Sequence, residues 1–231
     1  MTLYKKVVLK LTGHIFSEDL LQKNLSEYSR LIRRLKEERL FQKLVIVAGG
    51  GELARFYISL GRKIGLDESS LDELGIMVSR IHAKLLGGAL MPHSCPRVPT
   101  SLDELATALN EYPIVVMGGL QPGHSTSAVA ALVAERIGSD LLLVATDVEG
   151  VYTQDPKIDK DARLLSSVSI RQLYELLMSA QGAAGTYELL DFVALKIIER
   201  SRIHTRIAKC EPSVISDILR GIDRGTIIKM S

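Results

Sequence analysis

Four short runs of Val, Ile and Leu stand out along the 231-residue chain. Each run is apolar at almost every position, which is the pattern of a strand buried on both faces of a parallel sheet. The runs occupy residues 7–11, 44–48, 114–117 and 141–145. We therefore predict four neighbouring strands in the interior of the protein.

Between these runs the apolar positions follow a helical period. In the first interval they recur at spacings of four and three residues, which predicts an amphipathic helix. These positions are Leu21, Leu25, Tyr28, Ile32 and Leu35. Similar patterns predict helices at about 52–64, 72–90 and 125–137. Alternating strands and helices predict a three-layer αβα fold with an open, mainly parallel sheet and right-handed crossovers.

The second half of the chain has a different pattern. Polar residues follow Tyr152 as far as Arg163 and predict a loop. A helix is expected near 169–179, and Asp191 is a candidate N-cap for a helix that ends near residue 201. Short strands are expected at about 203–208 and 226–230. Since no linker or repeat separates the halves, we predict one domain, 1–231, with a single shared sheet.

Composition and charge exclude several classes of protein. Lys and Arg number 29 and Asp and Glu number 27, for a net charge of +2. No strong electrostatic field therefore favours binding to nucleic acid or to an anionic membrane. The longest apolar run, 128–134, is far shorter than the roughly 20 residues of a membrane span. Lys10 interrupts the first apolar run, so no secretory signal is expected. Cys95 and Cys210 are far apart, which favours reduced thiols and a soluble, cytoplasmic protein.

Each of the four buried strands is followed by an unusual loop. The loops are 12–13, 49–51, 118–123 and 146–150, and the first three contain glycines at their turns. The carboxyl ends of parallel strands form the ligand crevice of an open sheet, so these loops should converge on one edge. Glycine lets backbone N–H groups approach an anion, and a following helix presents its positive end. We expect two phosphate sites facing each other, although a tight turn explains any single glycine equally well.

Charged residues near these loops are candidate ligands of phosphate. Lys10 lies inside an apolar strand, where its charge is costly unless an anion compensates it or an edge strand exposes it. Arg55 follows Gly51 by about one helical turn and can face either solvent or phosphate. Asp72, Asp147 and Asp155 are either ligands or ordinary cap and turn residues.

Three common motifs match only in part. Residues 118–125 have the spacing of a phosphate-binding P-loop, but His124 replaces its lysine. Residues 123–127 approach a nucleophile elbow, but Ser127 replaces the last glycine. Residues 49–54 satisfy G-x-G-x-x-A, but they follow the second strand, whereas the dinucleotide fingerprint follows the first. A P-loop enzyme, a serine hydrolase and a dinucleotide enzyme are therefore disfavoured.

Taken together, segments 10–13, 48–51, 118–126 and 145–156 resemble the amino-acid kinase superfamily and, within it, the uridylate (UMP) kinases of the archaeal type. The resemblance extends to 185–191 and to 225–228, and so covers essentially the whole chain. Four positions depart from the commonest pattern. They are Thr12 for a smaller residue, His14 for Lys or Ser, Asp147 for Asn and Glu149 for Asp.

The resemblance implies transfer of the γ-phosphoryl group from Mg-ATP to UMP in pyrimidine nucleotide biosynthesis. It implies UMP-binding residues Gly50, Asp72, Gly118, Gly119, Leu120, Gln121, Pro122, Gly123, His124, Ser125 and Thr126 in an acceptor lobe of about 1–140. It implies ATP-binding residues Lys10, Gly13, Gly51, Arg55, Thr146, Tyr152 and Asp155, with an ATP lobe of about 141–231.

The same resemblance assigns catalytic roles and partners. Lys10, Asp147 and Lys196 are the implied catalytic residues, although Lys196 fits a solvated helix face equally well. Mg²⁺ is expected to bind mainly through the ATP phosphates, without a protein metal site. The resemblance also implies a homo-oligomer, a hexamer built through 72–90. Two alternatives remain open: a kinase of the same fold that acts on another small acid or phosphate, and a nucleotide- or oxyanion-binding protein without turnover.

Overall fold

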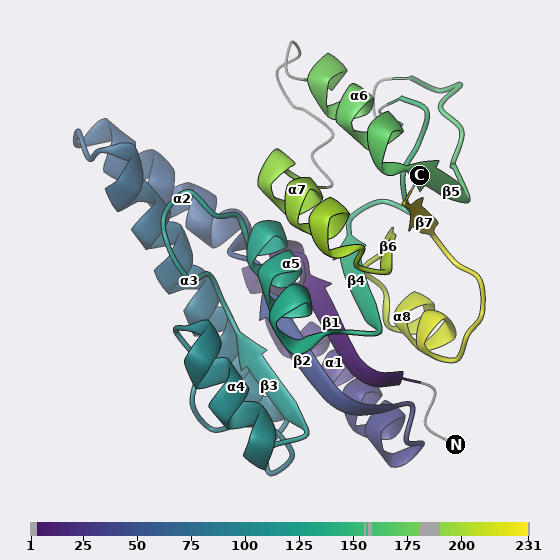
Figure 1. The fold of residues 1–231 in the computed structure, drawn as a ribbon. Coiled ribbons are helices and arrows are strands. Elements are labelled where there is room, and N and C mark those ends of the chain that lie inside the picture. Colours follow the sequence, from purple (N-terminus) through teal and green to yellow (C-terminus); the bar gives the residue numbers. More distant parts are fainter. Residues whose placement is uncertain (1–3, 155, 157–158, 181–189, 231) are drawn as a thin grey trace.

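The computed structural model describes residues 4–154, 156, 159–180 and 190–230 (Figure 1). Within them, seven strands form one sheet in the order β3-β2-β1-β4-β6-β7-β5. The strands are β1 (Tyr4–Leu11), β2 (Phe41–Ala48), β3 (Ile114–Met117), β4 (Leu141–Thr146), β5 (Ser167–Ser169), β6 (Thr205–Lys209) and β7 (Thr226–Lys229). All neighbours pair in parallel except β6 and β7, which are antiparallel. The predicted mainly parallel sheet, shared by both halves of the chain, is confirmed.

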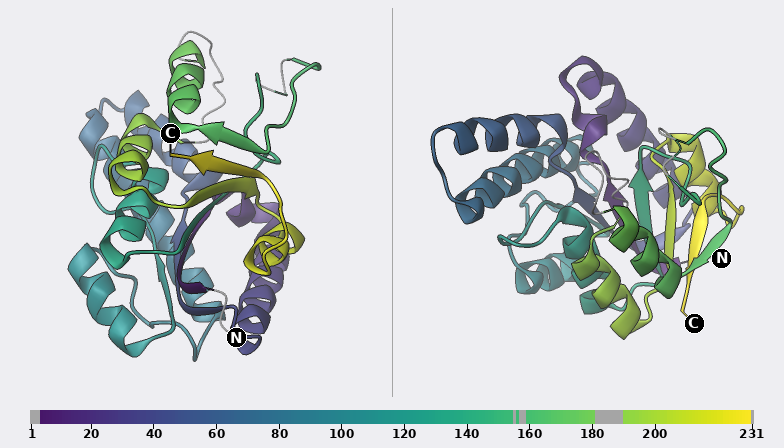
Figure 2. Two further views of the ribbon diagram at one scale, coloured as in Figure 1. Left: turned by 45° about the vertical axis from the view of Figure 1, so that its right-hand side comes forward. Right: turned by 90° about the horizontal axis from the view of Figure 1, so that it is seen from above.

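Helices cover both faces of this sheet (Figure 2). They are α1 (Leu21–Glu37), α2 (Gly51–Lys63), α3 (Glu68–Ala89), α4 (Leu102–Glu111), α5 (Thr126–Ile137), α6 (Ile170–Ala180), α7 (Phe192–Ser201) and α8 (Pro212–Leu219), with short 3₁₀ turns η1 (Gly13–Phe16) and η2 (Glu18–Leu20). Alternate strand residues point to opposite faces, so Val8 packs in a core with α4, α5, α6 and α7, whereas Leu9 packs with α1, α3 and α8. The three-layer αβα architecture follows from these two cores.

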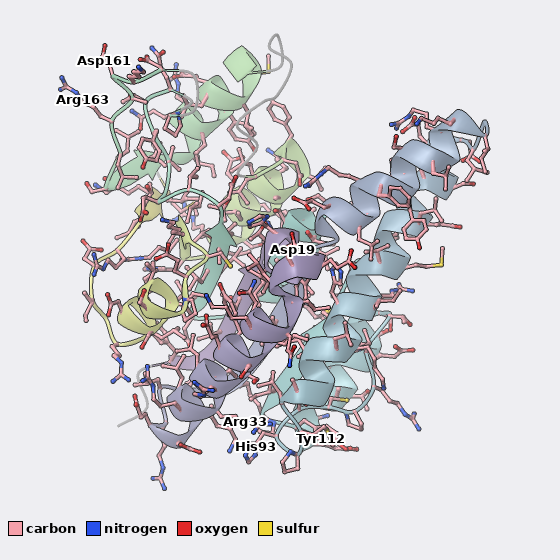
Figure 3. The ribbon with its side chains drawn as sticks, turned by 180° about the vertical axis from the view of Figure 1, so that it is seen from behind. Asp19, Arg33, His93, Tyr112, Asp161 and Arg163 are labelled. Atoms are coloured by element: carbon pink, nitrogen blue, oxygen red, sulfur yellow. The ribbon has the colours of Figure 1, made fainter. Side chains whose placement is uncertain are left out.

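Helix α3 packs against both α2 and α1. Helices α2 and α3 lie side by side as a long hairpin that projects from the body (Figure 1). Helix α1 lies on the same face of the sheet as the C-terminal half of α3 (Figure 3). Arg33 on α1 donates a 3.2 Å hydrogen bond to the carbonyl of Met91, just after α3. No helix among the described residues is long and apolar enough to cross a membrane.

Most of the predicted elements are present, with shifted ends. The predicted helix 72–90 begins earlier, at Glu68, because Asp67 caps it by accepting a hydrogen bond from Ser70 N. Two helices, α4 and α8, and the short strand β5 were not predicted. For α4 the signal exists in the sequence, since Ser101 caps the helix through Glu104 N and Leu105 and Leu109 are buried. Helix α8 likewise begins with a proline, Pro212, at its first turn.

Candidate active site

The four glycine-containing or polar loops begin at one edge of the sheet, as predicted. Leu11 at the end of β1 pairs with Ala48 of β2 and Ala145 of β4, and Met117 at the end of β3 pairs with Val47. The parallel register therefore brings the loops after β1, β2, β3 and β4 together. The carboxyl edge of these strands is the place where an open α/β sheet binds ligands.

The loops after β1 and β2 touch through their backbones. A Cβ on Gly13 would lie 2.0 Å from Gly51 N, and one on Gly51 would lie 2.4 Å from Gly13 O. Gly51 also has a φ of +61°, in the left-handed region that favours glycine. No side chain fits between the two loops, so they meet through bare peptide groups.

The first turn of α2 lacks a capping side chain. Its N-cap is Gly50, whereas α3, α4, α5 and α7 are each capped by the side chain of an Asp or Ser. The first N–H groups of a helix need a partner, and together with the helix dipole they favour an anion. The amides at the start of α2 are therefore suited to bind a phosphate.

Lys10 lies in β1 between β2 and β4, so the alternative that an edge strand exposes it is wrong. Burial lowers the pKa of Lys10, while the nearby carboxylates of Asp147 and Asp191 oppose this shift. The neighbouring thiol of Cys210 adds no charge at neutral pH, since burial raises its pKa. Lys10 is thus a partly buried cation at the centre of the crevice, which a bound phosphate would stabilise.

Helix α3 holds the loop that follows β3. Asp72 Oδ2 accepts a 2.8 Å hydrogen bond from Gly123 N, and Ser79 Oγ accepts one of 2.8 Å from Gly119 N. Arg80 donates to the carbonyls of Gly119 and Leu120 at 3.0 and 3.1 Å. Sequence reasoning missed Ser79 and Arg80, because nothing in a helical pattern shows that two of its polar residues bind a distant loop. Asp72 is exposed and lies beside the loop 118–126, which the resemblance assigns to the same UMP site.

The end of the same loop is joined to the second half of the chain. Ser125 caps α5 by accepting hydrogen bonds from Ser127 N and Ala128 N, and its hydroxyl donates to Asp191. Asp191 in turn caps α7 by accepting from Ala194 N at 2.8 Å. The predicted N-cap role of Asp191 is confirmed, whereas its contact with Ser125 had no signal in the sequence. Because Ser125 satisfies the first turn of α5 itself, that helix offers fewer free amides than α2 does.

The loop after β4 is held by a cluster of charges. Thr146 is buried and donates to Asp147 Oδ1 at 3.1 Å. Lys209 lies 2.9 Å from Glu149 and 2.8 Å from Glu211, and both carboxylates raise its pKa. This cluster ties the loop to the end of β6. No group of three or more His, Cys, Asp or Glu that could hold a metal occurs in the described part of the chain.

Exposed side chains predominate among the remaining candidates. Arg55 is exposed on α2, and Tyr152 forms an isolated bridge with Leu164. Lys196 is exposed on α7 and pairs with Glu199 at 3.3 Å, a geometry that matches a solvated helix face. His14 is exposed, 3.9 Å from Glu52. Asp155 and most of 185–191 lie outside the described residues.

Comparison with known proteins agrees with this geometry. The model of the amino acid kinase family matches residues 5–209, which is most of the chain and includes all four loops. The chain belongs to the amino acid kinase family. Among relatives within this family, the uridylate kinase of Sulfurisphaera tokodaii is 43% identical over 226 residues, 97% of this chain and 99% of that protein. The uridylate kinase of Methanocaldococcus jannaschii is 40% identical over the same shares.

A solved structure from this family has the same architecture. The crystal structure of uridylate kinase from Archaeoglobus fulgidus has a TM-score of 0.86 and 38% sequence identity, and the match covers 97% of this chain and 100% of that one. The chain therefore has the fold of this family along nearly its full length.

Proposed function

We propose that the chain transfers the γ-phosphoryl group of ATP to UMP, giving ADP and UDP, and so serves pyrimidine nucleotide biosynthesis in the cytoplasm. The observation that carries this proposal is that Lys10 and the uncapped start of α2 lie at the same edge of the sheet. Similarity to uridylate kinases over nearly the whole chain supports UMP as the acceptor.

The two nucleotides are assigned to the two halves of the sheet edge. We assign UMP to the lobe of about 1–140, where Asp72 and the loop 118–126 lie together, and we assign Gly50 to the same site. We assign ATP to the lobe of about 141–231 together with Gly13, Gly51 and Arg55. In this arrangement Thr146 and Tyr152 contact ATP, and Lys10 lies between the two nucleotides.

Direct phosphoryl transfer between the two nucleotides needs no covalent bond to the protein. The attacking oxygen of UMP belongs to a phosphate that is already an anion, so no general base is needed. The main obstacle is to align two polyanions and to stabilise charge on the transferred group. Lys10 and the amides at the start of α2 provide that stabilisation as groups fixed before the substrates arrive. Asp147 then orients the Lys10 ammonium, which its carboxylate stabilises.

The residues present are compatible with Mg²⁺ bound chiefly through phosphates. Asp147, exposed at the end of β4, is an oxygen ligand of the kind that Mg²⁺ prefers. Bound to ATP, the ion would neutralise part of the phosphate charge. The protein's share is to orient the nucleotide with its own glycine loops and Lys10.

We also propose that the chain assembles as a hexamer through α3. Met77, Ile81 and Leu85 recur every four residues on that helix and are exposed at 52%, 54% and 41%. Such a stripe forms one apolar face, and apolar faces of this kind are typical of protein interfaces. Sedimentation velocity of the purified protein, compared with a Met77→Glu/Ile81→Glu variant, tests this: the variant should sediment as a smaller species.

The activity is tested with ATP, Mg²⁺ and a panel of acceptors, by separating the nucleotides chromatographically. We expect ADP and UDP in equal amounts with UMP and far slower turnover with CMP or AMP, since a site built on specific hydrogen bonds rejects acceptors that leave its groups unpaired. Faster turnover of a carboxylate or an isoprenoid phosphate would overturn the assignment of UMP. Tight binding of UMP without release of ADP would favour a binding protein.

A further inference from the structure

A buried histidine on α3 contacts the segments that follow β1 and β2. His82 is only 3% exposed, and its Nδ1 lies 2.8 Å from the carbonyl oxygen of Gly49. A carbonyl oxygen only accepts, so Nδ1 carries a hydrogen and donates it. The ring also stacks on Phe16, with centroids 4.4 Å apart and planes 7° apart. One imidazole therefore contacts the end of η1, after β1, and the first residue after β2.

The ring is neutral near pH 7. Burial lowers the pKa of His82, and the hydrogen bond to Gly49 opposes this shift only in part. A neutral imidazole with its hydrogen on Nδ1 forms this bond without adding a buried cation. His82 thus acts as a hydrogen-bond donor and a flat packing surface.

The bond to Gly49 fixes the direction of the next amide. The peptide between Gly49 and Gly50 is trans, so the Gly49 carbonyl and the Gly50 N–H point in opposite directions. Since the carbonyl points to α3, the Gly50 N–H points away from it. Within the described residues this N–H donates no hydrogen bond. Its direction is fixed by the fold, and it remains available to a ligand.

We propose that His82 is a positioning residue that keeps the Gly50 N–H directed at the phosphoryl group during transfer. This rests on the proposed kinase function. A glycine peptide rotates at little steric cost, so without an external bond the amide would leave its orientation part of the time. An amide fixed toward developing charge contributes mainly to the transition state and hence to kcat.

Three variants separate this role from simple packing. His82→Leu keeps an apolar side chain but removes the donor. His82→Asn keeps a donor, because its Nδ2 is as many bonds from Cβ as the histidine Nδ1. Phe16→Leu removes the stacking and leaves the hydrogen bond. For each we would measure kcat, the KM of ATP and of UMP, and Tm, with the full-length protein.

We expect His82→Leu to lower kcat about 10–100-fold with each KM changed less than about threefold, the scale of a misplaced catalytic donor. His82→Asn should restore most of kcat, and Phe16→Leu should lower Tm more than kcat. If His82→Leu does not fold, His82→Met, whose flexible side chain fills irregular gaps, replaces it.

Unchanged kcat in the folded donor-free variant overturns the assignment, as does a His82→Asn variant no better than His82→Leu. The wild-type protein is measured first, with UMP as acceptor. Absence of turnover there overturns the proposed function itself, whereas normal wild-type turnover with an unaffected His82→Leu overturns only the role of His82.

Discussion

The hydroxyl of Ser125 donates a hydrogen bond to Asp191, 66 positions further along the chain, and each of the two residues caps a different helix. Through this bond the end of the proposed acceptor loop is tied to the start of α7. Asp191 also acts on the pKa of Lys10. One contact therefore links the two halves of the sheet edge at the place where two nucleotides would have to meet.

A double-mutant cycle tests this link. Ser125→Ala and Asp191→Ala each remove a helix cap, which should lower the free energy of unfolding by about 0.5–2 kcal/mol. Because they share a hydrogen bond, the double variant should lose less than the sum of the two, measured by urea unfolding. Additive losses would mean that the two caps act independently. Ser101→Ala, which removes the cap of α4, is the control for a cap without this partner.

Asp72 should control the affinity for UMP. Its carboxylate lies at the acceptor loop, where a charged hydrogen bond to a ribose hydroxyl is worth about 1.5–3 kcal/mol, or roughly 10–150-fold in KM. Steady-state kinetics of Asp72→Ala should show a raised KM for UMP and little change for ATP. Asp67→Ala on the same helix removes only the cap of α3, so it should lower Tm without changing either KM. A change confined to the KM of ATP would reverse the two nucleotide assignments.

The contact between Gly13 and Gly51 leaves no space for a methyl group. In Gly13→Ala the new Cβ would meet backbone atoms, which cannot move as a flexible side chain can, so both Tm and activity should fall sharply. Gly88→Ala is the matched control, since Gly88 lies on α3 with open space around its Cβ position. That variant should be as stable as the wild type or more so, by up to about 1 kcal/mol. Retention of full activity by a folded Gly13→Ala protein would contradict the requirement for glycine at this contact.

The buried charge of Lys10 should lower the free energy of unfolding. Because burial lowers its pKa below the ordinary 10.5, the unfolded chain binds more protons between the folded pKa and 10.5, and stability rises with pH over that window. Lys10→Met removes the buried charge, so at pH 7 its free energy of unfolding should exceed that of the wild type. The difference should shrink toward pH 10. A less stable Lys10→Met protein at pH 7 would show that Asp147 and Asp191 more than offset the cost of burial.

Sequence patterns predicted the parts of this fold that depend on local periodicity. The four buried runs, the amphipathic α1 and the convergence of the loops follow from apolar spacing and from the geometry of parallel sheets. The contacts made by Ser79, Arg80 and His82 could not be predicted, since each joins α3 to a loop at least 33 residues away. Their partners are backbone groups, which have no sequence signature. The bond between Ser125 and Asp191 could not be predicted either, because it joins residues 66 positions apart.

The most direct test of the account is the rate of UMP phosphorylation by Lys10→Ala. Removing one fixed charge that stabilises a transition state should lower kcat by roughly 10²–10³, with Tm and the circular dichroism spectrum of a folded protein retained. Lys23→Ala, which removes an exposed lysine on α1, should turn over UMP at the wild-type rate. Near-normal kcat in a folded Lys10→Ala protein would contradict the placement of phosphoryl transfer at this edge of the sheet.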